Sequence, residues 1–395
     1  MHNSRLSRIL FLDINAAFIN PTRTLLPLVL DSHCTSTFFG PGYVSENVLD
    51  RGLDDYIENH GPFDMVLTTS HILLSTIWEK IPEGYRRSYQ CYFPHRLLFQ
   101  LNNIREAFYR VPFPKAAVLL ESDYYNFTNF HIDRLDCCDY MFGFSDQFWK
   151  AVSNTNADQE VWGGKANNQW FDFLKRRGSD IVPFHHMVHS GEFSFRPLQA
   201  RATEWNVPGA SYAARRSAML HLKNAKLKPM RGTYLRYFDL LRRIGIFPNE
   251  SQWRIKLLNN LFQLGMENSR YVFTCGSGLM MPIRKFFEIP ASGALMVCTP
   301  CNGFEALGFH NGINAIISQP EELSDLTNDL RKNPDRAQRI AQEGQSVVLR
   351  HHTVEARGRQ FARVVSAIAN KTFYGAFFEN GEIVLKQEKN ESVQR

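Results

Sequence analysis

The sequence predicts an α/β protein with two doubly wound domains, each built on a parallel sheet, facing each other across a cleft. Two observations lead to this prediction. Short apolar runs alternate with segments of helical length and mixed polarity, which is typical of strands joined by crossover helices. The alternation stops in an Asn-rich stretch at 153–170 and then begins again, so there are two series. No apolar run reaches ~18 residues, and no membrane-spanning helix is expected.

The first series contains four expected strands and a helix at 44–59. In a doubly wound sheet, ligands bind beyond the carboxyl ends of the strands. The polar residues at those ends are therefore candidates for a site. The expected strands are 8–14, 63–69, 114–120 and 139–145. The polar residues at their ends are Asp13, Ser70, His71, Glu121, Asp123 and Ser145.

The second series follows a connector at 181–197. Pro320 and the two glutamates after it predict a helix start, because proline suits the first turn and acids suit the positive end of the helix dipole. Helical segments are expected from there to about residue 369, and the last 25 residues show no clear periodicity. Strands are expected to end at 205–210 and to lie at 271–275, 294–300 and 313–318.

The cysteines and the N-terminus indicate where the protein resides. Seven cysteines are spread along the chain without a disulfide framework, which fits a reducing compartment. Asp13 interrupts the first apolar run and no small-residue cleavage site follows it, so the run reads as a buried strand and not as a signal peptide. We expect a cytoplasmic protein.

The charge of the chain is uneven. Between Arg201 and Lys256 there are twelve Lys or Arg residues against three Asp or Glu residues. Such a segment suits phosphates, nucleic acid or an anionic membrane surface, and it equally suits a solvated helical face. The sequence leaves these readings open.

Two motifs that suggest redox or metal chemistry are better explained structurally. Cys298-Thr-Pro-Cys301 has dithiol spacing, but Cys298 falls inside an apolar strand and Asn-Gly follows, whereas a reactive dithiol needs a helix N-terminus. His185, His186 and His189 lack the Glu of an HExxH helix, and the preceding Pro183 indicates a connector. No metal site is expected.

A nucleotide site is suggested by RKFFEIPASG, residues 284–293. Glu288 would lie near the start of a short helix, where its carboxylate can accept hydrogen bonds from the two hydroxyls of a ribose. Arg284 and Lys285 beside it suit a diphosphate. Gly276-Ser277-Gly278 resembles half of a dinucleotide fingerprint. The plainer alternative is a surface glutamate between two solvated cations.

These motifs together resemble the C-terminal domain of group 1 glycosyltransferases, and are closest to the branch typified by spore-maturation protein B. The similarity covers about residues 270–365 and extends more loosely through 207–216. The matching elements are Arg284 to Gly293 with its F-E-x-x-A-x-G pattern, Gly312 with the strand after it, His352-Thr353 and Arg357.

The resemblance implies a GT-B fold, with an acceptor-side domain at 1–185 and a donor domain at 186–354. It further implies a helix at 355–370 that crosses back to the first domain, and a tail at 371–395. By the same resemblance the donor is a UDP- or GDP-sugar, bound as a co-substrate without a permanent cofactor or metal. The implied donor contacts are Glu288 for the ribose, Arg284, Lys285, Arg215 and Gly209 for the diphosphate, and Gly276 and Ser277 for the sugar.

The sequence departs from the retaining relatives at one position. Those relatives carry a second glutamate eight positions before Glu288, where this chain has Met280. The resemblance still implies retention, in which the leaving phosphate takes the acceptor proton. An inverting reaction needs a base on the first domain, and Asp123 is the first candidate and His71 the second.

The acceptor stays open at the level of sequence. A surface glycan, a glycolipid and a protein are the expected classes. A hydroxylated DNA base is an alternative because of the basic segment, and a non-catalytic nucleotide-sugar-binding module is another. The basic segment also allows peripheral contact with the anionic inner face of a membrane.

Overall fold

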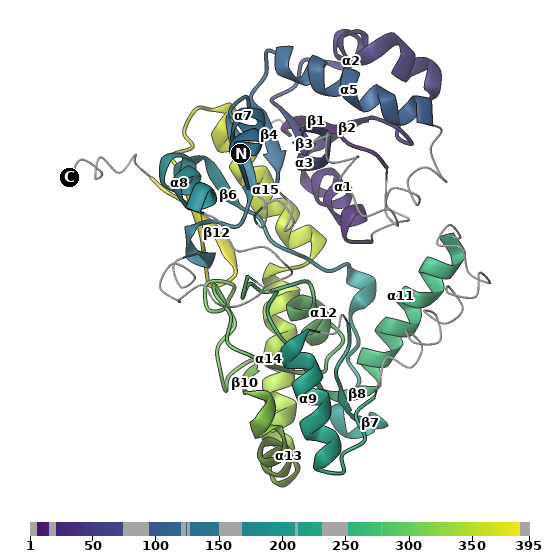
Figure 1. Ribbon diagram of the computed structural model, residues 1–395, viewed down its shortest axis with the longest axis vertical. Coiled ribbons are helices and arrows are strands. Elements are labelled where there is room, and N and C mark those ends of the chain that lie inside the picture. The colour runs from purple at the N-terminus through teal and green to yellow at the C-terminus, as the bar shows by residue number, and fades with distance from the viewer. Residues whose placement is uncertain are drawn as a thin grey trace.

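The computed structural model contains two parallel β-sheets stacked along the long axis of the molecule, each flanked by helices (Figure 1). This confirms the predicted α/β class with two parallel sheets. The structure describes residues 6–15, 21–73, 95–119, 124, 127–149, 168–209, 212–230, 252–277 and 279–387.

The first sheet has six strands, all parallel, in the order β2-β1-β3-β4-β5-β6. Apart from the edge strand β2, its strands are mainly apolar and buried, as expected when helices cover both faces of a sheet. The strand order reverses between β1 and β3, which is the switch point where such sheets bind ligands. The strands are β1 (Arg8–Leu12), β2 (Thr35–Phe39), β3 (Met65–Thr69), β4 (Lys115–Val118), β5 (Tyr140–Gly143) and β6 (Ile181–Pro183).

Helices connect the successive strands of this sheet, because parallel neighbours need a crossover. The carboxyl end of β3 leads directly into the short helix α3 (Ser70–Leu73). The other helices are α1 (Pro21–His33), α2 (Glu46–His60), α5 (His95–Arg110), α7 (Asn129–Leu135) and α8 (Asn168–Arg177).

The second sheet has four strands, again all parallel, in the order β10-β9-β8-β7. The strands are β7 (Thr203–Asn206), β8 (Ser269–Thr274), β9 (Leu295–Cys298) and β10 (Ile316–Ile317). The helices are α9 (Ala213–Asn224), α11 (Gln252–Glu267), α12 (Lys285–Ala291), α13 (Leu323–Lys332) and α14 (Pro334–His351). Short 3-10 turns are η2 (Asp146–Phe148), η3 (Gly178–Asp180), η4 (Ser190–Glu192), η5 (Leu198–Ala200) and η6 (Pro320–Glu322).

The two domains are joined by buried apolar side chains. One hydrophobic cluster extends from the strands of the first sheet to Phe286, Phe287 and Phe304 of the second domain. The ring of Phe148 lies so close to Gly303 that a Cβ there would overlap it, and Gly303 also has a positive φ of 71°. Glycine is therefore needed at this contact, both for the backbone and for the space.

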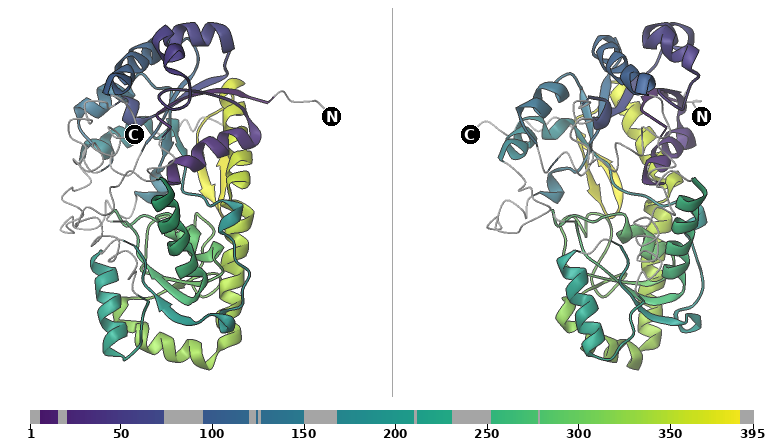
Figure 2. Two further views of the ribbon diagram at one scale, coloured as in Figure 1. Left: turned by 90° about the vertical axis from the view of Figure 1, so that its right-hand side faces the viewer. Right: turned by 45° about the vertical axis from the view of Figure 1, so that its right-hand side comes forward.

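Helix α15 (Val354–Ala369) follows α14 and packs along α1 of the first domain (Figure 2). The close approach depends on Gly358, because a Cβ at this position would overlap Ser32 Oγ and lie 3.0 Å from the Val29 carbonyl oxygen. The last helix thus links the end of the second domain to the first helix of the chain. The exact domain boundaries at 185 and 354 stay predictions.

The end of the chain forms an element that the periodicity did not reveal. β11 (Ala376–Glu379) and β12 (Glu382–Leu385) form an antiparallel hairpin. Asn380 and Gly381 form its turn with φ of 49° and 89°, the positive values that Asn-Gly hairpin turns adopt. Strands β2 and β6 were also not predicted, because TSTFF has only two apolar residues and β6 has three residues in all.

We predict that Gly358→Ala weakens the docking of α15 on α1. The added methyl group meets backbone and cannot be accommodated without a shift, so the free energy of unfolding should fall by about 1–3 kcal/mol. Urea denaturation followed by circular dichroism measures this change.

Gly265→Ala is the matched control for this prediction, because Gly265 is also helical and its added Cβ would have 3.6 Å to the nearest atom. It should be neutral or stabilising by up to ~1 kcal/mol through helix propensity. Equal stability changes for the two variants would contradict the proposed role of Gly358.

Candidate functional site

The carboxyl ends of both sheets point toward the domain boundary. β6 ends at Pro183 and leads into His185, whose ring centroid lies 5.4 Å from that of Phe287 on α12. α12 itself follows the carboxyl end of β8 through the loop at 275–284. Residues from the strand ends of one domain therefore contact the helix that carries the candidate nucleotide motif of the other.

The loop after β8 is folded tightly on itself. Within it Ser277 N donates to Met281 O at 2.8 Å, and Met280 N donates to Ser277 O at 2.8 Å. Ser277 Oγ accepts from Leu279 N at 3.1 Å. A Cβ on Gly276 would lie 3.0 Å from the carbonyl carbon of Met280, so the fold of this loop favours glycine. The structure thus places Gly276 and Ser277 in an ordered turn between β8 and α12.

Glu288 is a buried carboxylate in the first turn of α12, with 7% of its surface exposed. Phe286, Phe287 and Ile289 around it are fully buried, so the helix is fixed by apolar packing. Glu288 Oε1 forms an ion pair with Arg284 Nη1 at 2.7 Å. A buried carboxylate needs such a partner to offset the loss of hydration. The solvated surface glutamate of the plainer alternative is therefore excluded.

Arg284 also binds a residue that the sequence did not point to. Its Nη2 lies 2.8 Å from both carboxylate oxygens of Glu192, at the end of η4 between the domains. Burial raises the pKa of Glu192, against the lowering effect of Arg284. The one local feature that could have pointed to Glu192 is a capping box, in which His189 N donates to Glu192 Oε1 at 2.7 Å. Arg284 is thus held between two carboxylates.

Lys285, Arg215 and Gly209 lie together beside Glu288. A Cβ on Gly209 would overlap Lys285 Cε and lie 2.9 Å from Arg215 Nη1. Arg215 is 3% exposed and donates from Nη2 to Thr274 Oγ1 at 3.1 Å, at the end of β8. Lys285 Nζ lies 4.8 Å from the ring centroid of Phe262. Two cations therefore converge near the carboxyl end of β8, packed against Gly209, where a side chain would displace them.

This pair of cations is electrostatically unfavourable without an anion. Burial lowers the pKa of Lys285, the charges of Arg215 and Arg284 lower it further, and Glu288 opposes the shift. Burial also lowers the pKa of Arg215. Within the described part of the chain, Lys285 has no ion pair. The arrangement suits a ligand with two negative charges close together, such as a diphosphate.

The histidines of the connector do not form a metal site in the described residues, where no group of three or more His, Cys, Asp or Glu is placed to hold an ion. His185 Nδ1 accepts from His186 N at 3.0 Å, so the proton of the neutral ring lies on Nε2. Burial lowers the pKa of His185 well below its usual range. Burial and the charges of Arg284 and Lys285 lower the pKa of His186 to about 4.

The cysteine pair is structural, as the sequence suggested. Cys298 is a fully buried residue of β9, and both Cys298 and Cys301 are free thiols. Burial raises the pKa of each thiol well above its usual value. Both sulfurs are therefore protonated at neutral pH and are poor nucleophiles.

The structure describes neither side chain of the two residues proposed as catalytic bases. Asp123 lies outside the described residues, and so does the side chain of His71, whose backbone belongs to α3. At the same strand ends Asp13 Oδ1 accepts from Thr69 Oγ1 at 3.1 Å and from Ile14 N at 2.8 Å. The bond from Thr69 ties together the ends of β1 and β3, on both sides of the switch point.

His352, Thr353 and Arg357, which belong to the recognised motif, form the joint between α14 and α15. Thr353 Oγ1 accepts from Ala356 N at 3.1 Å and caps α15. Arg357 is fully buried and donates to His352 Nδ1 and to Gln360 Oε1, and its guanidinium lies 4.7 Å from the ring centroid of Phe378. Burial lowers the pKa of Arg357 to about 9. These residues hold the fold and not the donor.

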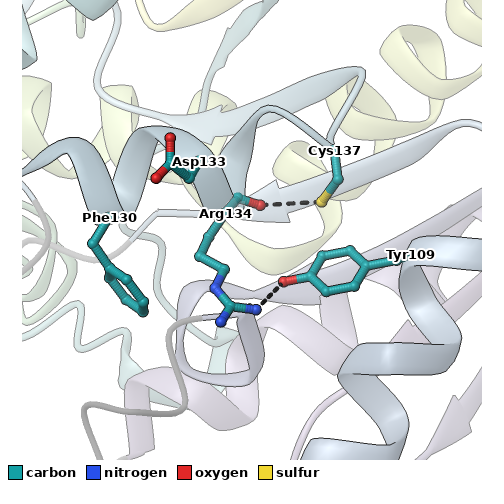
Figure 3. A pocket seen from close by; sticks show the side chains of 5 residues that line it. All are labelled: Tyr109, Phe130, Asp133, Arg134 and Cys137. Atoms are coloured by element: carbon teal, nitrogen blue, oxygen red, sulfur yellow. Dashed lines mark hydrogen bonds between the residues drawn. The ribbon is translucent and has the colours of Figure 1, made fainter.

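A separate pocket of about 520 Å³ lies on the first domain (Figure 3). Arg134 donates to the Tyr109 hydroxyl at 2.8 Å, and Cys137 donates to the Arg134 carbonyl at 3.1 Å. Tyr109 ends α5 and Cys137 follows α7, so the pocket lies toward the amino ends of β4 and β5. It is thus at the opposite end of the strands from the candidate site. Its lining residues are Tyr109, Phe130, Asp133, Arg134 and Cys137.

Comparison with known proteins gives one match to a protein-family model. Residues 264–363, which include α12, match a family model described as glycosyl transferase-like. No curated protein sequence matches the chain. The matched segment includes Glu288.

Two solved structures share the whole fold. HepE from Anabaena, solved in complex with UDP, has 12% sequence identity and a TM-score of 0.52, with 91% of this chain and 100% of HepE covered. Sucrose-phosphate synthase from Thermosynechococcus elongatus has 10% identity and a TM-score of 0.51, with 92% and 100% covered. These similarities confirm the GT-B fold.

We predict that His185 contributes to acid sensitivity. Because its folded pKa is depressed, its contribution to stability is present above its usual pKa of about 6.5 and is lost as the pH falls below that value. His185 lies among the rings of Phe144, Phe148 and Phe287. The variant His185→Phe should take up one proton fewer than the wild type when it unfolds in acid. The measurement is urea denaturation between pH 7.5 and 5.

The slope of the unfolding free energy below pH 6 should be smaller in His185→Phe by about 1.4 kcal/mol per pH unit. A variant slope equal to that of the wild type would show that His185 is protonated in the folded protein.

Proposed function

We propose that this protein is a glycosyltransferase that moves a sugar from a nucleoside-diphosphate sugar to an acceptor hydroxyl without a metal ion. The observation that carries the proposal is the buried carboxylate of Glu288 beside the cations Lys285 and Arg215. This combination offers acceptors for a ribose and positive charge for a diphosphate within one short segment. It lies in the part of the chain that matches a glycosyl transferase-like family.

The donor is held by groups with distinct roles. Glu288 accepts the ribose hydroxyls, because Arg284 engages its Oε1 and a carboxylate has about four acceptor sites in all. Lys285 and Arg215 bind the diphosphate, and the absence of a side chain at Gly209 leaves the space that these two cations occupy. The ordered backbone at Gly276 and Ser277 faces the sugar, in place of the second glutamate replaced by Met280. UDP is the first nucleotide to test, because HepE has the same fold and was solved with UDP; GDP is the second.

In the proposed reaction the bond between the anomeric carbon and the diphosphate oxygen breaks, and a bond from the acceptor oxygen to that carbon forms. The negative charge that grows on the diphosphate is stabilised by Lys285 and Arg215, which are in place before the reaction. With retention, the acceptor proton passes to the leaving phosphate. With inversion, Asp123 or His71 takes it.

The family branch and the acceptor are finer parts of the proposal. We assign the chain to the branch typified by spore-maturation protein B, from the F-E-x-x-A-x-G element at 287–293 and the His352, Thr353 and Arg357 joint. The proposed acceptor is a surface glycan, a glycolipid or a protein, reached in the cytoplasm or at the inner face of a membrane. None of the described helices has the length and apolarity to cross a membrane.

The proposal predicts nucleotide binding that depends on Glu288. Isothermal titration calorimetry with UDP, GDP, ADP, CMP and dTDP in the presence of EDTA should show binding of one nucleoside diphosphate. Glu288→Ala should weaken it about 10- to 100-fold, since a charge-assisted hydrogen bond contributes about 1.5–3 kcal/mol. Lys285→Met should weaken the diphosphate but leave the affinity for the nucleoside unchanged.

Glu305→Ala is the control, because Glu305 is an exposed glutamate of the same domain, and it should bind as the wild type does. Absence of binding for all five nucleotides, with the protein folded, would contradict the proposal. Binding without turnover of the corresponding nucleotide sugar, over a panel of acceptors, would indicate a binding module in place of an enzyme.

A further inference from the structure

We infer that Glu192, from the segment between the domains, is a positioning residue for ribose recognition and acts on Glu288 through Arg284. The inference rests on the proposed function, and it changes the role of Arg284 within it. Arg284 serves the ribose site by orienting a carboxylate, and the diphosphate is left to Lys285 and Arg215.

The geometry of Arg284 is set by two carboxylates. Its Nη2 lies 2.8 Å from both oxygens of Glu192, and its Nη1 lies 2.7 Å from Glu288 Oε1. Each terminal nitrogen thus has a different carboxylate, and the side chains of all three residues are at most 20% exposed. Arg284 cannot turn toward a diphosphate without giving up at least one of these partners, and this loss would leave a carboxylate poorly paired.

Glu192 is itself fixed to the second domain. His189 N holds its Oε1, and two residues later Ser194 N donates to the Ala291 carbonyl at the end of α12, at 3.1 Å. Gln345 Nε2 of α14 bridges Ser194 O and Ala291 O at 2.8 and 2.9 Å. The segment that carries Glu192 is therefore tied to both ends of α12, through Arg284 at one end and through Ala291 at the other.

The charge balance explains why Glu192 matters for the ribose. With Glu192 ionised, Arg284 divides its two terminal nitrogens between two acceptors and engages only one oxygen of Glu288. If the charge of Glu192 is removed, a bidentate pair with Glu288 becomes the best arrangement for the guanidinium, because parallel fork contacts are the strongest that arginine makes. That pair would place an arginine donor on each oxygen of Glu288, so no oxygen would be left entirely to the ribose.

The test measures ribose recognition separately from diphosphate binding. Dissociation constants for UDP and for 2′,3′-dideoxyuridine 5′-diphosphate are compared by calorimetry, with the guanosine pair used if GDP is the nucleotide that binds. Glu192→Gln should weaken UDP about 10-fold and change the dideoxy nucleotide less than 2-fold. Arg284→Lys, which keeps the charge but lacks the fork, should show the same selective loss.

Glu204→Gln is the matched control, because Glu204 also pairs with an arginine, Arg331, through two contacts of 2.6 Å on another face of the domain. It should change neither constant. Thermal melting confirms that each variant is folded.

The outcomes separate this inference from the proposed function. If the wild type prefers UDP over the dideoxy nucleotide and Glu192→Gln keeps that preference, the positioning role of Glu192 is wrong and the ribose site stands. An equal loss for both nucleotides would instead make Arg284 a diphosphate ligand. If the wild type binds both nucleotides equally, the ribose site of the proposed function is wrong, and the role of Glu192 fails with it.

Discussion

The arrangement of the donor side depends on one guanidinium, that of Arg284, between the carboxylates of Glu192 and Glu288. Removing three charges from water is costly, and their attraction offsets that cost only when every member is paired. The pairing gives the buried carboxylate of Glu288 a partner in a helix that also carries Phe286 and Phe287. It also explains how an acid can stay buried at a site that needs a hydrogen-bond acceptor.

A second buried cation performs a different task at the other end of the domain boundary. Arg357 finds its acceptors among neutral groups: His352, Gln360 and the Gly381 carbonyl. With a pKa of about 9, its guanidinium stays protonated at neutral pH. It connects the start of α15 to the turn of the C-terminal hairpin, while Gly358 brings the same helix onto α1. The contact between α15 and α1 therefore adds to the apolar cluster that joins the two domains, and Phe287 of α12 reaches the same joint, with its ring centroid 4.8 Å from that of His352.

The two remaining cations of the site, Lys285 and Arg215, repel each other. Burial is the largest cause that lowers the pKa of Lys285, the charge of Glu288 opposes it, and the charges of Arg215 and Arg284 add to it. A bound diphosphate would reverse this relation, because its charges favour the protonated lysine. Preorganised charge of this kind stabilises a leaving group without a further rearrangement at the moment of reaction. The same two positive charges that favour binding of a diphosphate thus disfavour the folded protein without one.

The sequence by itself determined the fold class, most of the strands and the nucleotide motif, because these are encoded in local periodicity and in residues adjacent along the chain. Glu288, Arg284 and Lys285 lie within one turn and needed no tertiary contact to be noticed. The hairpin at Asn380-Gly381 also had a local signal, although the periodicity around it was too short to predict it. Strands β2 and β6 had no local signal, because they are strands through pairing with their neighbours and not through their composition.

The partner of Arg284 was decided only by the tertiary structure. Glu192 lies 92 residues earlier in the chain, and nothing in its surroundings shows which cation it meets. Gly209 and Arg215 were grouped with Lys285 by the family resemblance, and the contact among them forms only once β7 and β8 have paired.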